Sequence, residues 1–183
     1  MLITDSLTIG PLAQVGQDVS VEGRAKLGLE SSNVLVLVSF DGMELKPAYE
    51  DWPRFSGLHF IVPESWNSRH PDTSAFESLG YSFVDLLRSS DVLIAKPGYG
   101  SFVEAGCSGT PVLYLPRQDW PETPILIDWL KQQGRCKEVS RKDFETGYLE
   151  GHVRDVMTKG RYKPVTTNRS FKNRRHFLFY IFG

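Results

Sequence analysis

The residues best suited to chemistry lie in one stretch, Asp91 to Pro116, which reads DVLIAKPGYGSFVEAGCSGTPVLYLP. Within it, Gly98, Tyr99, Gly100 and Ser101 follow an apolar run and precede a helical segment with small side chains. We expect the glycines to turn the backbone through positive φ and to let a ligand come close to it. The free N–H groups and the dipole at the start of such a helix favour a phosphate.

Glu104 lies three residues after Ser101, which is the spacing of a capping box. Two interpretations of the turn stay open. It binds a phosphate group, or it is an ordinary strand–glycine–helix connection of the kind that binds nothing. The dinucleotide fingerprint is absent, because no third glycine follows Gly98 and Gly100 at the required spacing. A nicotinamide enzyme is therefore not indicated.

The elements that must position these residues alternate between short apolar runs and helical segments. We predict a doubly wound parallel sheet of the α/β class with about six strands, and ligands in such sheets bind beyond the carboxyl ends of the strands. The predicted strands lie near residues 34–40, 58–62, 81–82, 91–95, 111–115 and 135–139. The predicted helices include 44–52, with Pro47 in its first turn, and a final helix over 144–157, while 64–79 is predicted to be a surface loop.

Composition indicates one globular domain. The chain has 183 residues, of which 40% are hydrophobic and 12% aromatic. Cys107 and Cys136 form no disulfide framework and are expected to be buried thiols in a reducing compartment. The isolated His59 and His70 are expected to be surface or hydrogen-bonded histidines rather than catalytic bases. No apolar run is long enough for a membrane span and no signal peptide is evident, so the expected location is cytoplasmic.

The Asp91–Pro116 block carries a resemblance to a known family. An aspartate, an apolar strand, the glycine turn, Glu104, Gly109-x-Pro111 and a second strand ending at Pro116 resemble the donor-binding half of GT-B glycosyltransferases. The group of the peptidoglycan-precursor N-acetylglucosaminyltransferase is the most similar. The variant KPGYG and the stretch RQDWPETP resemble the glycosyltransferase-like N-terminal region of plant arabinokinases. The similarity covers roughly residues 10 to 157.

The resemblance implies a site for a nucleotide sugar, with UDP as the expected nucleotide. Main-chain N–H groups would hold the diphosphate, a carboxylate would take both ribose hydroxyls, a strand-to-helix junction would read the base, and acidic side chains would bind the sugar. In this sequence the matching positions are Gly42, Gly98, Tyr99, Gly100 and Ser101 for the diphosphate, Glu104 for the ribose, Phe83 and Val84 for the base, and Asp119 and Glu122 for the sugar. The last pair could equally belong to a capped surface helix.

The resemblance also divides the chain. Residues 1–29, with GPL and RAKLGL, would be a linker from an acceptor-binding half that the sequence lacks, and 30–158 would be the Rossmann-like nucleotide-sugar-binding domain. No catalytic base is assigned, because in the resembled family it comes from the acceptor half. No metal is expected, since no Asp-x-Asp pair is present, and no other cofactor is implied.

Residues 159–183 form a basic and aromatic tail. Its basic residues carry +7, so a net charge of −1 for the whole chain leaves −8 for the rest. Basic and aromatic side chains together are typical of a segment that contacts a membrane surface or docks to a partner, and the tail could also begin a further element. The acidic charge of the rest of the chain argues against binding of nucleic acid.

Three functions stay open. In the first, the chain is the donor-binding half of a glycosyltransferase, and an acceptor domain or subunit is its partner. In the second, it is a non-catalytic nucleotide-sugar-binding or regulatory module. In the third, it is an unrelated Rossmann-like enzyme.

Overall fold

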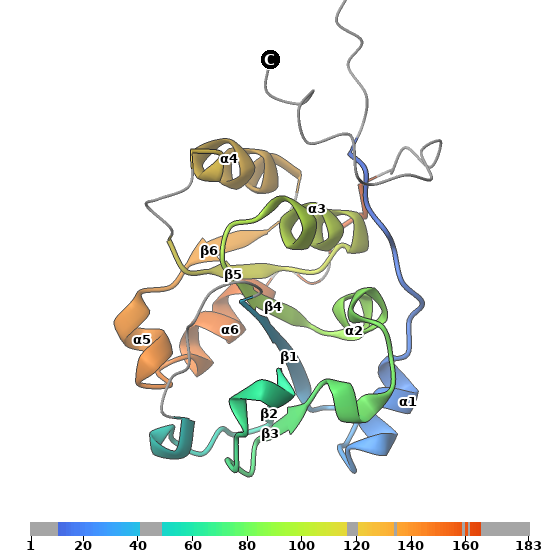
Figure 1. Ribbon diagram of the computed structural model, residues 1–183, viewed down its shortest axis with the longest axis vertical. Helices are drawn as coiled ribbons and strands as arrows, with labels where there is room; N and C mark the ends of the chain where they lie inside the picture. Colours follow the sequence, from blue (N-terminus) through green and yellow to red (C-terminus); the bar gives the residue numbers. More distant parts are fainter. Residues whose placement is uncertain are drawn as a thin grey trace, which may run out of the picture.

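The computed structural model describes residues 11–40, 49–116, 121–133, 135–158, 160 and 162–165. In this part of the chain six parallel strands form one sheet in the order β3-β2-β1-β4-β5-β6 (Figure 1). The strands are β1 (Val34–Ser39), β2 (Leu58–Val62), β3 (Thr73–Ala75), β4 (Val92–Ala95), β5 (Val112–Tyr114) and β6 (Cys136–Glu138). The predicted α/β class with a parallel sheet of about six strands is confirmed.

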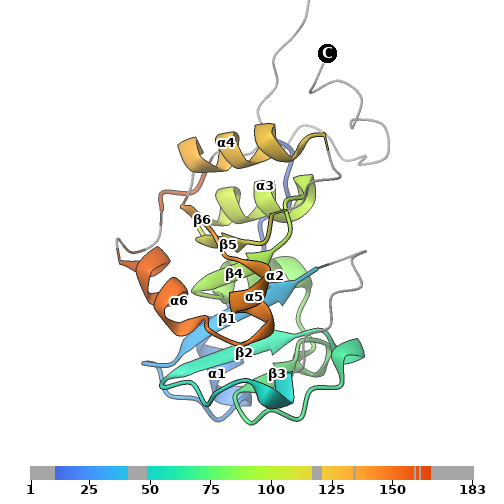
Figure 2. The ribbon, with the colours of Figure 1, turned by 90° about the vertical axis from the view of Figure 1, so that its left-hand side faces the viewer.

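Helices cover both faces of the sheet (Figures 1 and 2). The helices are α1 (Ser20–Lys26), α2 (Phe83–Ser89), α3 (Tyr99–Ser108), α4 (Thr123–Gln133), α5 (Arg141–Glu145) and α6 (Glu150–Met157). Three short 3-10 helices, η1 (Tyr49–Asp51), η2 (Glu64–Trp66) and η3 (Glu77–Leu79), join the strands at one edge. Side chains of α2, α3 and α4 pack on one face, and those of α5, α6, η1 and η2 pack on the other.

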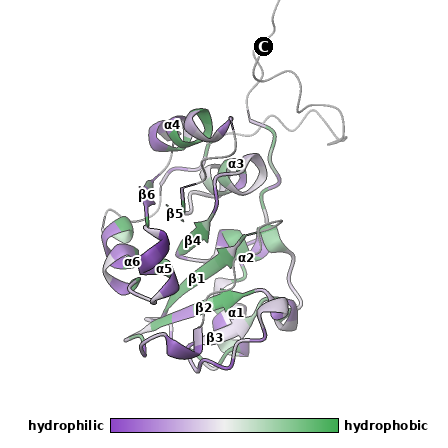
Figure 3. Cartoon of the chain, turned by 60° about the vertical axis from the view of Figure 1, so that its left-hand side comes forward, coloured by the Kyte–Doolittle hydropathy of each residue, from purple (hydrophilic) through white to green (hydrophobic). Residues whose placement is uncertain are grey.

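This two-sided cover explains why the strands are apolar at nearly every position rather than at alternate ones. In β1, Leu35 and Leu37 contribute to the core beneath α2 and α3, while Val36 and Val38 contribute to the core beneath α6. Figure 3 shows the central strands as the hydrophobic part of the fold, with hydrophilic residues on the outer helices.

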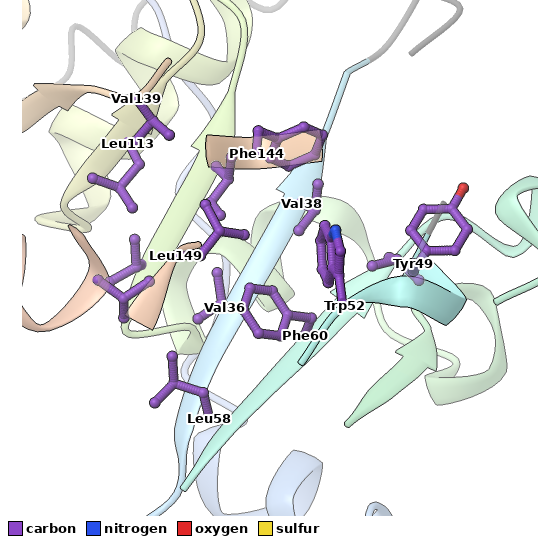
Figure 4. Close-up of a cluster of buried hydrophobic side chains, with 14 of the residues drawn as sticks. Val36, Val38, Tyr49, Trp52, Leu58, Phe60, Leu113, Val139, Phe144 and Leu149 are labelled. Carbon is purple, nitrogen blue, oxygen red and sulfur yellow. The ribbon is translucent and has the colours of Figure 1, made fainter. Parts of the chain in front are cut away.

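Aromatic side chains fill the core beneath α5 and η1 (Figure 4). Trp52 lies between Tyr49 and Phe60, with ring centroids 5.8 Å and 5.3 Å away. Phe144 of α5 packs edge-on against Phe40 at 5.0 Å. These contacts hold Phe40, η1 and Trp52 against the sheet.

The strand predicted at 81–82 is wrong, and so is the prediction that 64–79 is only a loop. The edge strand is β3, which pairs with β2 through Phe60↔Thr73 and Val62↔Ala75. Its polar sequence, Thr-Ser-Ala, gives no apolar run to detect. Ser82 instead caps α2 in a capping box with Asp85.

The single final helix predicted over 144–157 is also wrong, because α5 and α6 are separate. Gly147 lies between them with φ +71, and a Cβ there would lie 2.7 Å from Cγ of Trp52. The helix predicted over 44–52 falls partly outside the described residues, as does Pro47. Its described end, Tyr49–Asp51, is a 3-10 turn.

Both ends of the described chain pack against the sheet and its helices. Arg24 of α1 donates to Oδ2 of Asp91 at 2.6 Å, and the same oxygen accepts the Leu35 N–H at 2.8 Å. At the other end, the Tyr162 N–H donates to the Gly109 carbonyl at 3.3 Å, beside the end of α3. The predicted tail beyond residue 165 lies outside the described residues. Among the residues that are described, no helix has the length and apolar character needed to cross a bilayer.

Candidate functional site

The sheet order places a switch point between β1 and β4. These neighbouring strands pair through Ser39↔Ala95. After β1 the chain builds the sheet toward one edge, with β2 next to β1, and after β4 it builds the sheet toward the other edge, with β5 next to β4. Open α/β sheets bind ligands in the crevice outside the carboxyl ends of such strands. The turn that follows β4 is Lys96–Gly98, which leads directly into α3. The candidate phosphate turn therefore lies at the switch point.

The glycines of this turn do not have the positive φ that the sequence suggested. Gly98 is extended, with φ −161 and ψ 143, and Gly100 lies inside the first turn of α3. A Cβ on Gly98 would meet nothing closer than Oγ of Ser101 at 3.7 Å, and a Cβ on Gly100 would have no described atom within 4 Å. Neither the backbone conformation nor the described packing requires glycine at these two positions.

The predicted capping box of Ser101 and Glu104 is wrong. α3 begins at Tyr99 with Gly98 as its N-cap, so Ser101 is already in the first helical turn. Gly98 has no side chain with which to cap the helix. The N–H groups of Tyr99, Gly100 and Ser101 precede the first intrahelical bond, which Phe102 makes to the Gly98 carbonyl at 3.0 Å. Of these three residues Gly100 is exposed, whereas Tyr99 and Ser101 are half-buried.

Glu104 lies one turn further along α3, on the same face as Gly100. It is a buried carboxylate with 8% of its surface exposed. Burial and the charge of Glu104 raise the pKa of the Cys107 thiol to about 11. On the next turn of this face, the buried Ser108 hydroxyl has no hydrogen-bond partner among the described residues.

Phe83 and Val84 are the first two residues of α2. The capping box of Ser82 and Asp85 already satisfies N–H groups at this end. A Cβ on Gly16 would lie 2.3 Å from the carbonyl carbon and oxygen of Val84, so the N-terminal segment covers one side of this peptide. A base could reach the main chain here only from another side.

The loop predicted to bind the sugar is described in part. Asp119 and Gly42 lie outside the described residues, while Glu122 is half-buried just before α4. The next residue, Thr123, begins α4, is 6% exposed, and its hydroxyl has no partner in the described part of the chain. Because α3 and α4 both follow parallel strands, their N-termini lie at the same edge of the sheet. Sequence reasoning missed Thr123, since a threonine at a helix start resembles an ordinary cap.

The two histidines predicted to be hydrogen-bonded or on the surface are buried and hydrogen-bonded. Nε2 of His59 lies 2.9 Å from the Ser74 hydroxyl. Nδ1 of His70 accepts the Asp72 N–H at 3.2 Å, and its Nε2 lies 3.2 Å from the Trp52 carbonyl. Within the described ranges no group of three His, Cys, Asp or Glu could hold a metal ion.

Two solved structures of glycosyltransferases are distantly similar to this chain. No family model and no curated protein matches the chain. The structure of the glycotransferase of kitacinnamycin is 14% identical, with a TM-score of 0.46 over 70% of this chain and 38% of that one. The glycosyltransferase SnogD from Streptomyces nogalater is 15% identical, with a TM-score of 0.44 over 83% of this chain and 44% of its own. This chain therefore spans less than half the length of either protein, and likenesses at this level carry no argument about what it binds.

Proposed function

We propose that this chain binds a nucleotide sugar, with UDP as the nucleotide, as the donor-binding half of a glycosyltransferase. The observation that carries the proposal is the first turn of α3, which lies at the switch point of the sheet and has Gly100 exposed. Gly98 and Gly100 occupy this turn although neither φ nor described packing requires them. Glycine at the N-cap position of Gly98 is also favoured by helix capping, whereas at Gly100 the absence of a side chain would let a ligand approach the main chain closely.

The diphosphate would lie against this turn. The N–H groups of Gly100 and Ser101 would donate to phosphate oxygens, and the positive end of the helix dipole adds to the attraction. During sugar transfer the bond between the anomeric carbon and the diphosphate oxygen breaks, so negative charge grows on that oxygen. Fixed N–H groups stabilise this charge without having to reorient.

The other contacts follow along the same edge of the sheet. Glu104 lies four residues beyond Gly100, which is about 6 Å along the helix axis, and its carboxylate can accept hydrogen bonds from both ribose hydroxyls. Phe83 and Val84 remain the proposed contacts for the base. Glu122 is the described candidate for the sugar hydroxyls, and Asp119, which lies outside the described residues, is proposed with it.

Transfer would also need an acceptor and a base to take the proton of its hydroxyl. No residue of the described chain is assigned that role. We propose that another domain or subunit supplies the acceptor site, while this chain binds the donor and stabilises the departing diphosphate without a metal.

A second candidate is a non-catalytic nucleotide-sugar-binding module. It is favoured by the sequence DGMELKPA after Phe40, where Gly42 is the only glycine and its neighbour is the acidic Asp41. A carboxylate beside a diphosphate opposes binding unless it points elsewhere. Nucleotide binding without transfer, even with an acceptor domain supplied, would identify this function.

Calorimetric titration of the full chain with UDP tests the proposal. Glu104→Gln keeps the size of the side chain but removes its charge. Since hydrogen bonds to a charged group contribute about 1.5–3 kcal/mol, we expect UDP affinity to fall about tenfold or more. 2′-deoxy-UDP lacks one of the two ribose hydroxyls, so Glu104→Gln should lower the affinity for 2′-deoxy-UDP less than it lowers the affinity for UDP. The absence of heat with UDP and with every UDP-sugar would refute the proposal.

A further inference from the structure

The segment before α1 is fixed along α2. We call residues 12–19 the strap. The Gln17 N–H donates to Oδ1 of Asp85 at 2.7 Å, and the Val19 N–H donates to the Ser89 hydroxyl at 2.7 Å. Figure 1 shows this blue segment running from α1 along α2. The N–H groups of Gln17 and Val19 are thus held by Asp85 and Ser89, whose side chains lie one turn apart on α2.

The contact between the strap and α2 is unusually close. Gly16 lies against the peptide between Val84 and Asp85, where a Cβ would be 2.3–2.4 Å from backbone atoms. The Asp85 carboxylate is held in place as well, because it accepts hydrogen bonds from Ser82 and from the Gln17 N–H. The same hydrogen bonds hold the pKa of Asp85 below its usual range. The strap therefore has a firm base on α2.

The strap reaches α3 at Tyr99. The Leu12 N–H donates to the Tyr99 hydroxyl at 3.3 Å, which joins positions 87 residues apart. Tyr99 is the first residue of α3 and lies between Gly98 and Gly100. Its ring is half-buried against the core beneath α2 and α3. Tyr99 is the only one of these three residues with a side chain, so any side-chain contact between them and the rest of the protein is made by Tyr99.

We propose that Tyr99 is a positioning residue for the diphosphate, which rests on the proposed function. Its hydroxyl fastens the first turn of α3 to the strap, and through the strap to α2. Glycine restricts the backbone less than any other residue, so we expect the tether to limit the conformational freedom on either side of Tyr99 before the ligand arrives. N–H groups that are already oriented bind a phosphate more tightly, because less conformational entropy is lost on binding.

Tyr99→Phe removes the hydroxyl and keeps the ring. One neutral hydrogen bond contributes about 1 kcal/mol, so we expect the affinity for UDP to fall about fivefold. Uridine has no phosphate, and its affinity should stay unchanged. Hydrogen exchange of the free protein should show faster exchange at Leu12. Tyr148→Phe, at an exposed tyrosine between α5 and α6, should leave all three measurements as in the wild type.

Leu12→Pro tests the same bond from the other side, because proline has no N–H. It should reproduce the selective loss of UDP affinity, and combination with Tyr99→Phe should add nothing further. The inference is overturned if Tyr99→Phe binds UDP as the wild type does, or if UDP and uridine weaken alike, which would indicate a merely structural role. A wild-type chain that binds no UDP would refute the proposed function and the positioning role with it, and hydrogen exchange at Leu12 would then report a structural tether only.

Discussion

At the scale of single residues, α3 uses glycine in two different ways. Gly106 is required by packing, because a Cβ there would lie 2.8 Å from Cη2 of Trp129 in α4, and Gly109 is required by its φ of +71. Gly98 and Gly100 meet neither requirement. The sequence predicted the place of the turn but not its conformation, since the predicted N-cap, Ser101, lies three residues after the observed N-cap, Gly98.

Contacts between distant residues explain what the sequence could not predict at the site. The Tyr99 hydroxyl is bound by Leu12, and the peptide of Val84 is covered by Gly16. Neither pair has a local pattern, because the partners meet only after the strap has packed on α2. The resemblance of the Asp91–Pro116 block predicted Glu104 as a site residue, but it did not predict that this carboxylate is buried.

His59 makes stability depend on pH. Burial lowers the pKa of His59 below its usual value, so the unfolded chain takes up this proton more readily than the folded one. The contribution of His59 to stability is complete above the unfolded pKa of about 6.5 and is lost as pH falls below it. We expect the free energy of unfolding, measured with urea, to decrease between pH 7 and pH 5. His59→Gln should flatten this decrease, and an equally steep curve would contradict the assignment.

At the scale of elements, apolar runs predicted β1, β2, β4 and β5 well. β3 was missed because Thr73–Ala75 is a strand only through its pairing with β2 and the hydrogen bond between Ser74 and His59. The break between α5 and α6 was missed for a similar reason. Gly147 is required there by the ring of Trp52, almost a hundred residues earlier in the chain. Tertiary contacts decided both elements.

The end of α3 gives a prediction about how the segment after α6 packs. Gly109 and Gly80 both end helices with nearly the same conformation, φ +71 and +70. A Cβ on Gly109 would lie 2.5 Å from the Tyr162 carbonyl oxygen, whereas a Cβ on Gly80 would meet no described atom within 4 Å. Gly80→Ala should cost about 1–2 kcal/mol for the left-handed conformation alone.

Gly109→Ala should cost clearly more than Gly80→Ala in the same urea denaturation, because it must also displace the backbone at Tyr162. Equal losses would show that residues 162–165 do not pack on α3 in solution.

At the scale of the whole molecule, alternation of strands and helices was enough to predict the class of fold. The order of the strands was not predicted, and it is this order that brings the ends of β1 and β4 together at a switch point. The proposed function depends on that position, since open α/β sheets bind their ligands outside the carboxyl ends of the strands at a switch point. Mixing the chain with an acceptor domain and a UDP-sugar would separate the enzyme from the binding module.

The most direct test of the account compares Gly100→Ala with Gly151→Ala. Each glycine is the second residue of its helix, is exposed, and has no described atom within 4 Å of a Cβ. Alanine favours helix by up to about 1 kcal/mol over glycine, so both variants should melt at or above the wild-type temperature. We predict that only Gly100→Ala loses UDP affinity, by about tenfold or more, because its methyl group would stand where the diphosphate approaches the main chain. Wild-type UDP affinity in Gly100→Ala would contradict the account.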